Sequence, residues 1–330
     1  MTRDRVLALL KESGADYCSG EKMSRELGLS RAAVWKAVEA LRKEGYDISS
    51  VPNRGYRLED SPDRLSAGEL AGALAGCVVG SNLVCLGSVD STNNYAKTLA
   101  GEGAPHGTVV LSDHQTGGRG RQGKGFVSPA GKGLYLTALL RPALPPMEVV
   151  NLTAWVAVAV CDAVEQVAGE RPGIKWTNDI ILHGKKLCGI LTELGLEAES
   201  GELQYVVVGA GINIGQTEED FGPEVAPVAV SLEQALGKRV RRADLAAAVI
   251  RALDRMMADF PAKKEEYLER YRADCLTTGH EVRLIQKGVA RTAFAETIDD
   301  DFALVVRWPD GRRETINAGD VSVRGLLGYV

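Results

Sequence analysis

The segment HQTGGRGRQGKG (residues 114–125) is the most informative part of the sequence. It contains three cations, Arg119, Arg121 and Lys124, and no acidic residue. The glycines between them let backbone N–H groups approach a ligand closely, so a polyanion such as the phosphate chain of a nucleotide suits this loop. The alternative is a flexible, solvated surface loop, because composition alone often produces one. We favour the phosphate-binding interpretation.

Two familiar nucleotide-binding patterns fail in this context. The glycines of GRGRQG (118–123) spell G-x-G-x-x-G, but such a fingerprint must open a helix, and the GFVSPAGKG that follows breaks helices. Lys124 stands where a Walker A lysine would, but Gly125 replaces the Ser or Thr that would hold Mg²⁺. GAGINIG (209–215) is likewise followed by no helical pattern. Neither a dinucleotide-binding fold nor a P-loop fold is therefore predicted.

The composition is that of a soluble globular protein with two or three domains. The 330 residues are 45% hydrophobic and 25% charged, and the net charge is −5. This charge argues against non-specific coating of nucleic acid but leaves room for a local DNA-binding surface. The six cysteines are scattered without a C-x-x-C pair, and there are four histidines, none spaced with a second ligand. We therefore expect no metal site built from protein side chains.

Membrane association is not expected. The longest apolar stretch, around residues 149–160, contains Asn151 and is followed by Asp162. This is typical of a buried helix that is too short and too polar to span a membrane. The N-terminal apolar run is brief, is broken by Lys11 and Glu12, and is followed by no cleavage site. We therefore expect a cytoplasmic protein.

Residues 1–62 are predicted to form a winged helix-turn-helix domain. Apolar residues at helical spacing mark three helices, and Ser30 is a suitable N-cap for the third. YDISSVPNRGYRL (46–58) then alternates in polarity around a turn, as a two-stranded wing would. Trp35, on the third helix, and Trp176, further along the chain, are interpreted as packing residues rather than ligand contacts.

Residues 63–274 and 275–330 are predicted to form a central mixed α/β catalytic domain and a small C-terminal SH3-like β-barrel. The chain as a whole is then an α+β multidomain protein. The central region has two long helical patterns, at 149–167 and 242–260, and strand patterns at 83–89, 108–114, 133–140, 173–182, 186–194 and 203–214. The tail has short strand patterns at 281–285, 289–298, 303–308 and 313–319. Asp310-Gly311, between the last two, is a hairpin signal.

Four ordered segments resemble the motifs of the biotin protein ligases. They are VDSTNNYAK (89–97), QTGGRGRQGKGF (115–126), IKWTNDIILHGKKLCGILTE (174–193) and VVGAGINIG (207–215). The N-terminal region and the β tail resemble the repressor-type and C-terminal domains of the family's bifunctional biotin operon repressors, so the resemblance covers the whole chain. Two departures stand out. Thr177 occupies a position that is usually proline, and Phe126 replaces a frequent tryptophan, which keeps an apolar face for an adenylate but no indole N–H.

The resemblance implies a biotin–[acetyl-CoA-carboxylase] ligase that uses ATP and Mg²⁺. The biotin carboxylate would attack the α-phosphate of ATP, giving biotinoyl-5′-AMP and pyrophosphate, and a lysine of the biotin carboxyl carrier protein would then accept the biotin. Since the first step joins two anions, catalysis should come mainly from positioning and positive charge. Lys186, Arg119 and Arg121 are expected to supply that charge, while ATP oxygens and water hold most of the Mg²⁺ shell. Asp179 is expected to orient or deprotonate the acceptor amine.

The implied binding residues fall into two overlapping sets. The biotin set supplies short polar groups and charge at an otherwise apolar pocket, and it consists of Ser91, Thr92, Asn93, Gln115, Arg119, Gly120, Arg121 and Lys186. The adenylate set consists of Gly118, Arg119, Arg121, Lys124, Phe126, Lys175, Asn178 and Asn213. The glycine-rich loop should order over the mixed anhydride and exclude water from it.

Each of these residues also has a purely structural alternative. Ser91, Thr92 and Asn93 could cap the helix that follows them. Lys175 and Lys186 could be solvated charges at strand ends. Asp179 could be an ordinary turn residue, and Asn213 could fix a buried turn.

The third helix and the wing are predicted to contact DNA, through phosphates and a few base edges in the major groove. The residues expected to do so are Ser30, Arg31, Lys36, Lys43, Arg54 and Arg57. The alternative is a helical module that serves protein contacts alone. The resemblance implies that biotinoyl-5′-AMP promotes a homodimer, which would couple biotin supply to repression at operator DNA of the biotin synthesis genes.

Two rival functions remain open at this point. One is a biotin-sensing transcription factor without ligase activity. The other is a lipoate or octanoate ligase or transferase of related fold. The arginines of the glycine-rich loop and the attached winged helix disfavour this alternative.

Overall fold

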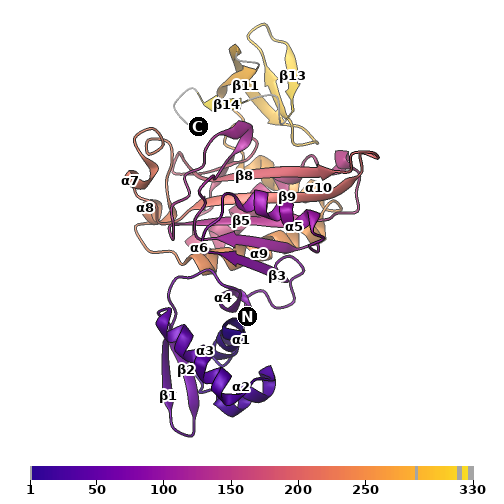
Figure 1. Cartoon of the computed structure of the whole chain (residues 1–330). Coiled ribbons are helices and arrows are strands. Elements are labelled where there is room, and N and C mark those ends of the chain that lie inside the picture. The colour runs from indigo at the N-terminus through magenta and orange to yellow at the C-terminus, as the bar shows by residue number, and fades with distance from the viewer. Residues whose placement is uncertain (1, 287–288, 318–321, 326–330) are drawn as a thin grey trace.

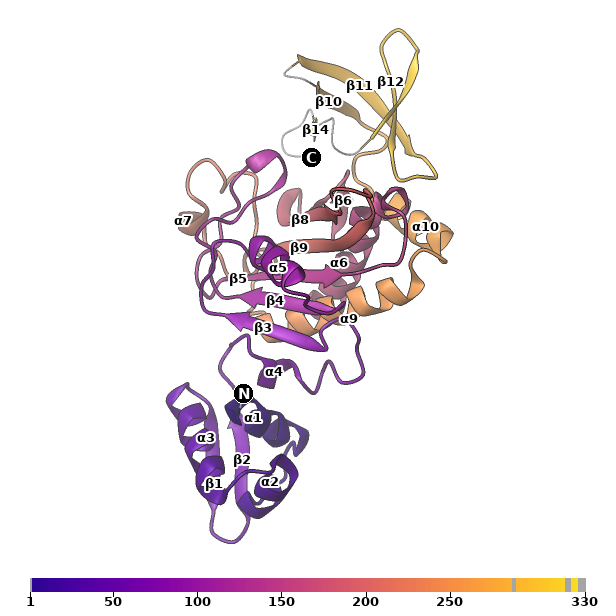
Figure 2. The same cartoon turned by 45° about the vertical axis from the view of Figure 1, so that its right-hand side comes forward.

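Three units follow one another along the long axis of the molecule (Figure 1). The computed structural model describes residues 2–286, 289–317 and 322–325. The N-terminal unit lies at one end, a large central unit carries the main sheet, and a small β unit lies at the other end (Figure 2). This arrangement agrees with the predicted α+β multidomain fold.

The N-terminal unit contains three helices and a two-stranded wing, as predicted. The helices are α1 (Thr2–Glu12), α2 (Gly20–Leu27) and α3 (Arg31–Lys43), and the wing pairs β1 (Asp47–Val51) with β2 (Gly55–Asp60). Ser30 is the N-cap of α3, since its side chain accepts a hydrogen bond from Ala33 N at 3.1 Å. The apolar faces of the three helices close a core of their own, formed by residues that include Val6, Leu7, Leu10, Met23, Val34, Val38 and Leu41.

The central unit is built on a seven-stranded mixed sheet with the strand order β3-β4-β5-β9-β8-β7-β6. Only the β3–β4 pair is parallel among these pairings. The strands are β3 (Asn82–Leu86), β4 (Thr108–Ser112), β5 (Gly133–Leu140), β6 (Gly173–Lys175), β7 (Asp179–Leu182), β8 (Lys185–Leu196) and β9 (Leu203–Asn213).

Helices cover both faces of this sheet. On one face α6 (Leu152–Ala168) and α9 (Arg242–Asp259) pack against each other and share the main core, with α10 (Lys264–Asp274) beside α6. On the opposite face α5 (Thr92–Gly101) packs on β4, β5 and β9 around a smaller apolar cluster. Both views show α5 lying across the strands on the side away from α6 and α9 (Figures 1 and 2). Short helices complete the unit: α4 (Ala67–Leu70), η1 (Arg121–Gly123), η2 (Pro146–Val149), α7 (Glu218–Phe221) and α8 (Leu232–Leu236).

Two details of the central prediction are wrong: the single strand predicted at 173–182, and the statement that the apolar stretch is too short and too polar to span a membrane. Residues 173–182 form an antiparallel hairpin, β6 and β7, rather than one strand, because the chain turns between Lys175 and Asp179. The apolar segment Pro146–Ala168 is 23 residues long and contains an 18-residue window with a mean hydropathy of 1.6, so length and composition alone do not exclude a membrane span. Since 67% of that window is buried inside the protein, the segment has the character of a core helix, as expected.

The C-terminal unit is a five-stranded antiparallel sheet with the order β13-β12-β11-β10-β14. Its strands are β10 (Glu281–Gln286), β11 (Val289–Ile298), β12 (Leu304–Arg307), β13 (Arg313–Ile316) and β14 (Ser322–Gly325). β14 was not predicted, and residues 318 and 319 of the last predicted strand lie outside the described residues. The buried residues of this sheet join the core of the central unit, and Trp176 Nε1 donates to Phe302 O at 2.9 Å. Trp176 is thus a packing residue, as expected.

The N-terminal and central units meet at the linker. Gly68 in α4 lies against α1, where a Cβ atom would come within 2.8 Å of Asp4 O. Arg242, at the start of α9, is 5% exposed and donates to Asp63 in the linker and, at 2.7 Å, to Asp113 before the glycine-rich loop. We propose domain boundaries at 62/63, just before this anchor, and at 274/275, where α10 ends.

Candidate functional site

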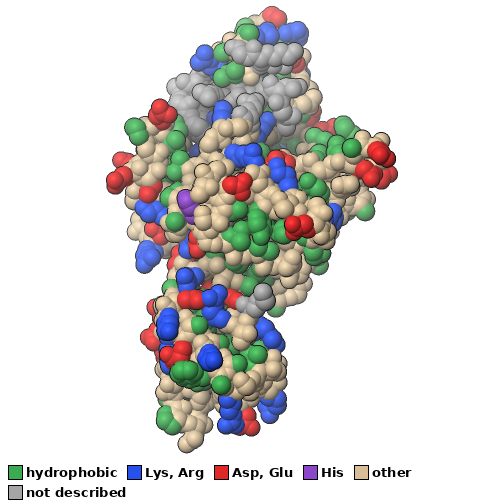
Figure 3. Space-filling model, viewed as in Figure 1, with side chains coloured by type: hydrophobic (Ala, Val, Ile, Leu, Met, Phe, Trp, Pro, Cys, Tyr) green, Lys and Arg blue, Asp and Glu red, His purple; other side chains and the backbone are tan. Residues whose placement is uncertain are grey.

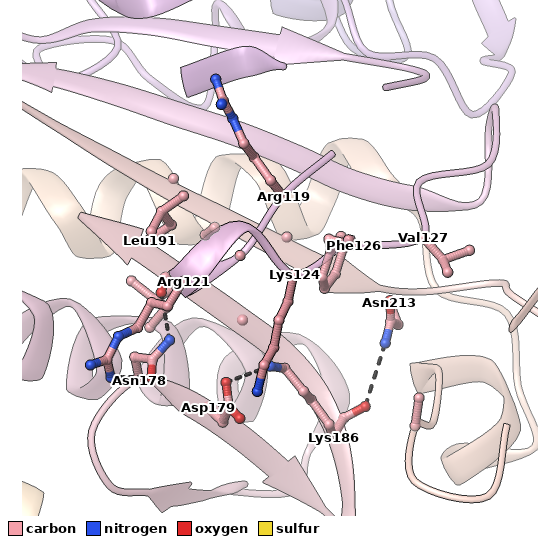
Figure 4. Close-up of a pocket in the computed structure, with 18 of the residues that line it drawn as sticks. Arg119, Arg121, Lys124, Phe126, Val127, Asn178, Asp179, Lys186, Leu191 and Asn213 are labelled. Atoms are coloured by element: carbon pink, nitrogen blue, oxygen red, sulfur yellow. Dashed lines mark hydrogen bonds and ion pairs between the residues drawn. The ribbon is translucent and has the colours of Figure 1, made fainter. Parts of the chain in front are cut away.

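A cavity of about 700 Å³ opens where the glycine-rich loop, the start of α5, strands β8 and β9 and the segment 221–229 meet. Every residue predicted to bind biotin or adenylate lines it except Gly118. The sequence-predicted residues that it brings together are Ser91, Thr92, Asn93, Gln115, Arg119, Gly120, Arg121, Lys124, Phe126, Lys175, Asn178, Asp179, Lys186 and Asn213. Figure 4 shows the charged side chains around this cavity.

Gly118 has a structural place beside the cavity. Its carbonyl accepts from Phe126 N at 2.9 Å, which closes the glycine-rich loop on itself. A Cβ atom at this position would lie 2.6 Å from both Phe126 O and Ser128 Oγ. Gly118 therefore makes room for the closure of the loop.

One end of the cavity is polar and is formed by the start of α5. Ser91 stands at the N-cap position of α5 but makes no side-chain cap hydrogen bond in the described structure, and Thr92 is buried. Gln115 Oε1 accepts from Thr92 N at 2.9 Å and lies 3.1 Å from Thr92 Oγ1. The helix-capping alternative is thus not what these side chains do here, and the polar groups face a cavity of ligand size.

Lys186 and Asp179 form an ion pair inside the cavity, with Nζ and Oδ1 2.5 Å apart. The hairpin β6–β7 and the start of β8 place them side by side, and Figure 4 shows the pair at the centre of the site. Asn213, on β9, donates to the carbonyl of Lys186 at 3.4 Å and to that of Val230 at 3.2 Å. These two bonds fix the strand that carries Lys186, which is the role of a buried positioning residue.

The cations of the glycine-rich loop point in different directions. Arg121 Nη1 donates to Asn178 Oδ1 at 3.2 Å, and Lys124 extends toward the Lys186–Asp179 pair (Figure 4). Arg119 extends away from that pair and donates to Asn94 Oδ1 (Figure 4). Loop movement is therefore needed before Arg119 can reach the same ligand atoms as Lys186 and Lys124.

Lys175 is 6% exposed although it lies at the end of β6. Lys175 also lines the cavity, so this buried residue is not the solvated strand-end charge of the structural alternative. No group of three or more His, Cys, Asp or Glu side chains in the described ranges could hold a metal ion.

Sequence reasoning missed several cavity residues. Gly209 and Gly211 share one face of β9 with Asn213 because side chains alternate along a strand, and this period of two was a signal that could have found them. The segment 221–229 contributes Phe221, Glu224, Val225, Val228 and Ala229 and gave no comparable signal, since it is largely irregular.

The predicted DNA-contacting residues lie on α3 and the wing of the N-terminal unit, over which Figure 3 shows Lys and Arg side chains mixed with Asp and Glu side chains. Lys36 and Lys43 are exposed on α3, and Ser30 is at its N-cap. Arg31 is exposed and lies 3.0 Å from Glu21. Arg57 pairs with Glu59, with Nη2 and Oε1 2.6 Å apart. The charges of Arg31 and Arg57 are therefore partly balanced within the unit.

Aromatic residues complete this surface. Arg54 and Arg57 both lie over the ring of Tyr17, at 4.5 and 4.8 Å from its centroid. Trp35 is 54% exposed on α3. The interpretation of Trp35 as a packing residue is wrong, because the apolar face of α3 turns Val34 and Val38 inward and leaves Trp35 beside Lys36 on the outside.

Known proteins share both the fold and the motifs of the cavity. Residues 86–213 match the biotin/lipoate A/B protein ligase family, residues 2–57 match an HTH domain, and residues 277–324 match the biotin protein ligase C terminal domain. A ligase of the biotin/lipoate class with an attached HTH domain is therefore present. The biotin protein ligase from Aquifex aeolicus, solved in complex with biotin and ATP, is 28% identical with a TM-score of 0.64, and the match covers 74% of this chain and 99% of that one.

Longer relatives identify the family more closely. The bifunctional ligase/repressor BirA of Bacillus subtilis is 40% identical over 258 residues, which are 78% of this chain and 79% of that protein. The bifunctional ligase/repressor BirA of Escherichia coli is 31% identical over 323 residues, which are 97% and 96% of the two chains. The chain belongs to this family of bifunctional ligase/repressor proteins.

Proposed function

We propose that the chain activates biotin with ATP to biotinoyl-5′-AMP, transfers biotin to a lysine of the biotin carboxyl carrier protein, and represses biotin synthesis genes from operator DNA. The observation that carries the proposal is that the polar start of α5 and the cations Lys124, Lys175 and Lys186 line one and the same cavity. That arrangement suits a small polar ring at one end and a phosphate at the other. A cytoplasmic location follows from the same substrates.

Lys186 is placed to bridge the two anions of the first step. Its ammonium group, held by Asp179, lies in the cavity with Lys124 nearby, so a carboxylate and an α-phosphate that meet there lose much of their mutual repulsion. Holding the two reactants in line supplies further rate enhancement. Asn213 keeps the backbone of Lys186 in place.

The glycine-rich loop supplies the remaining charge. Arg121 already faces the cavity through Asn178, and Arg119 would leave Asn94 to join the phosphate once the loop orders over the adenylate. A closed loop protects the mixed anhydride from water. Phe126 lies over Gly211 and offers its ring to the adenine.

Mg²⁺ would enter with ATP. The cavity has two acidic side chains, Asp179 and Glu224, and Asp179 is already paired with Lys186. The residues present therefore fit a Mg²⁺ ion that is held chiefly by phosphate oxygens and water, and when bound it neutralises phosphate charge. In the transfer step, Asp179 would orient the incoming lysine amine and accept its proton.

Repression is proposed to use a ligand-promoted homodimer, since helix-turn-helix proteins usually read two half-sites. The basic surface of α3 and the wing would contact DNA. Equal operator binding with and without biotin and ATP would exclude the coupling between biotin supply and repression.

Transfer of labelled biotin to a biotin carboxyl carrier domain, with ATP and Mg²⁺, tests the ligase. We expect label on the carrier with the wild type and with Lys185→Ala, a control lysine next in sequence, and a loss of about a hundredfold or more with Lys186→Ala. Failure of the wild type with a known good carrier would leave a biotin-sensing protein without ligase activity. Competition by lipoate or octanoate, but not by biotin, would favour the related acyl ligases.

A further inference from the structure

The wing of the N-terminal unit pairs with the segment that joins α1 to α2. Cys18 N donates to Tyr56 O at 2.8 Å and Tyr56 N donates to Cys18 O at 2.9 Å, which makes an antiparallel bridge to β2. Gly55 makes this approach possible, because a Cβ atom there would lie 2.2 Å from Cys18 O. The wing is therefore not a free hairpin, since its tip is fixed against the residues around Cys18.

The ring of Tyr17 lies across the wing. The antiparallel bridge places Tyr17 opposite Arg57 in the next row of the pair. The Tyr17 hydroxyl is 3.5 Å from the Oγ atom of Ser49, which is the partner of Arg57 on β1. The guanidinium carbons of Arg54 and Arg57 lie 4.5 and 4.8 Å from the ring centroid, within the range of about 6 Å for a cation–π contact. One aromatic ring thus contacts both arginines of the wing.

The two arginines differ in what else holds them. Glu59 Oε1 accepts from Arg57 Nε at 2.8 Å and from Arg57 Nη2 at 2.6 Å, and it accepts from Ser49 Oγ at 2.5 Å. Arg57 therefore has a balanced charge and a fixed position even without the ring. Arg54 is exposed at the tip of the wing and pairs with no acidic side chain in the described part of the chain. Its N–H donors remain available to an anion outside the protein.

We propose that Tyr17 is a positioning residue for DNA binding, whose ring holds the Arg54 guanidinium ready for one phosphate of the DNA backbone. The inference rests on the proposed repressor function. An exposed arginine loses side-chain freedom when it binds, and a side chain that is already held in place avoids much of this loss. A guanidinium that stacks by its face still presents its N–H donors along its edge, where phosphate oxygens can accept from them.

A phosphate is the ligand that matches Arg54. It carries a full negative charge, and Arg54 is the cation of the wing that Glu59 does not balance. Charge-assisted hydrogen bonds from arginine to phosphate are among the strong ones, and contacts of this kind fix the orientation of a protein on the duplex. Arg54 would therefore set how the wing lies on the DNA while α3 occupies the groove.

Fluorescence anisotropy tests this with DNA that the full-length protein selects from a random pool in the presence of biotin and ATP. Tyr17→Leu should weaken binding about three- to tenfold, because Arg54 then has to be ordered on binding. Tyr17→Phe keeps the ring and should bind like the wild type. Arg54→Ala should weaken binding about tenfold or more. In the Arg54→Ala background Tyr17→Leu should have no further effect, since no group is left for the ring to position.

Single replacement of phosphates by uncharged methylphosphonates locates the contact. At the phosphate that Arg54 contacts, the wild type should lose about tenfold or more in affinity, and its advantage over Tyr17→Leu should vanish there. That advantage should persist when other phosphates are replaced. If it vanishes at no phosphate but is lost on a base substitution, Arg54 contacts a base edge and the phosphate assignment is overturned.

Equal losses from Tyr17→Leu in the wild-type and Arg54→Ala backgrounds would show a merely structural role and overturn the inference. If the melting curve shows that Tyr17→Leu does not fold, Arg54→Lys takes its place. Lysine keeps the charge but has no planar group to stack, so binding should weaken about threefold or more, and binding equal to the wild type would overturn the inference. A wild type that binds no DNA refutes the proposed repressor function itself, which distinguishes the two failures.

Discussion

Replacing Gly211 by alanine should move Phe126 off the cavity without unfolding the protein. A Cβ atom at Gly211 would lie 2.6 Å from Cε1 and 2.8 Å from Cζ of the Phe126 ring. Carbon atoms in contact sit about 3.5–4.0 Å apart, so the ring must retreat by about 1 Å. The Phe126 backbone is held by Gly118 O and Ser128 Oγ, and the half-buried ring is free to rotate, so the movement falls on the side chain.

The expected effect of Gly211→Ala is therefore weaker binding of ATP. Stacking of an aromatic side chain on a base contributes about 1–3 kcal/mol, which corresponds to a loss of about fivefold to 150-fold in ATP affinity for Gly211→Ala. Calorimetric titration of ATP measures this, and a double variant with Phe126→Ala should be no weaker than either single variant. The melting temperature should stay within a few degrees of the wild type.

Gly209→Ala is the matched comparison on the same face of β9. Here the added Cβ would lie 2.2 Å from Asn93 Oδ1, and Asn93 is held by Glu193, Leu191 and Thr137. Because this neighbour cannot retreat, we expect a loss of about 1–3 kcal/mol of stability and weaker biotin binding. Wild-type ATP affinity in Gly211→Ala, or equal losses of stability in the two variants, would refute the placement of Phe126 over the adenine.

Three further outcomes follow from exposure, charge and the linker. Iodide should quench chiefly the fluorescence of Trp35, which is 54% exposed while the other three tryptophans are at most 4% exposed. Operator DNA should remove that quenching if α3 enters the major groove. Quenching that DNA leaves unchanged contradicts this docking. Burial raises the pKa of Glu193, but the hydrogen bond and charge of Lys97 outweigh it and hold that pKa below its ordinary 4.5. A depressed pKa contributes stability that is fully present above about pH 4.5 and is lost as the pH falls through the folded-state pKa. The melting temperatures of the wild type and Glu193→Gln should therefore converge in acid. A difference in melting temperature that does not change with pH would contradict the depressed pKa. Arg242→Ala should lower the free energy of unfolding by about 2 kcal/mol and expose the linker at Asp63 to limited proteolysis. A cleavage rate equal to that of the wild type would show that another contact anchors the linker.

The elements that sequence patterns predicted well are those whose apolar period is strong. Helix α3 has its N-cap and buried stripe where expected, and β5 spans Gly133–Leu140, as predicted. The hairpin within 173–182 was missed because β6 (Gly173–Lys175) has only three residues, which are too few to show an alternating pattern before the chain reverses. Trp35 was misplaced because a large apolar side chain on a helix normally faces the core, although the buried stripe of Val34, Val38 and Leu41 leaves position 35 outside it.

The sequence likewise predicted some features of the candidate site and not others. Ordered motifs were enough to collect nearly all of the predicted residues around one cavity, since each motif lies at the end or on one face of a strand or helix. They could not give the direction in which a flexible cation points. Arg119 lines the cavity but extends toward Asn94, away from the Lys186–Asp179 pair. Nor could they reveal the wall formed by 221–229, whose place depends on tertiary contacts such as the ion pair of Lys132 with Asp220.

Three glycines within the segments that imitate nucleotide-binding fingerprints make room for neighbouring atoms. Gly118 lets the loop close on Phe126, Gly209 admits the amide of Asn93, and Gly211 admits the Phe126 ring. Two of these three glycines lie inside a strand, where side chains on one face recur every second residue. GAGIN therefore encodes two gaps and one amide on the cavity side of β9, an arrangement that a helix-opening glycine motif would not produce. Since each gap is filled by a side chain from a different segment, the spacing of these glycines carries information about the cavity that their number alone does not.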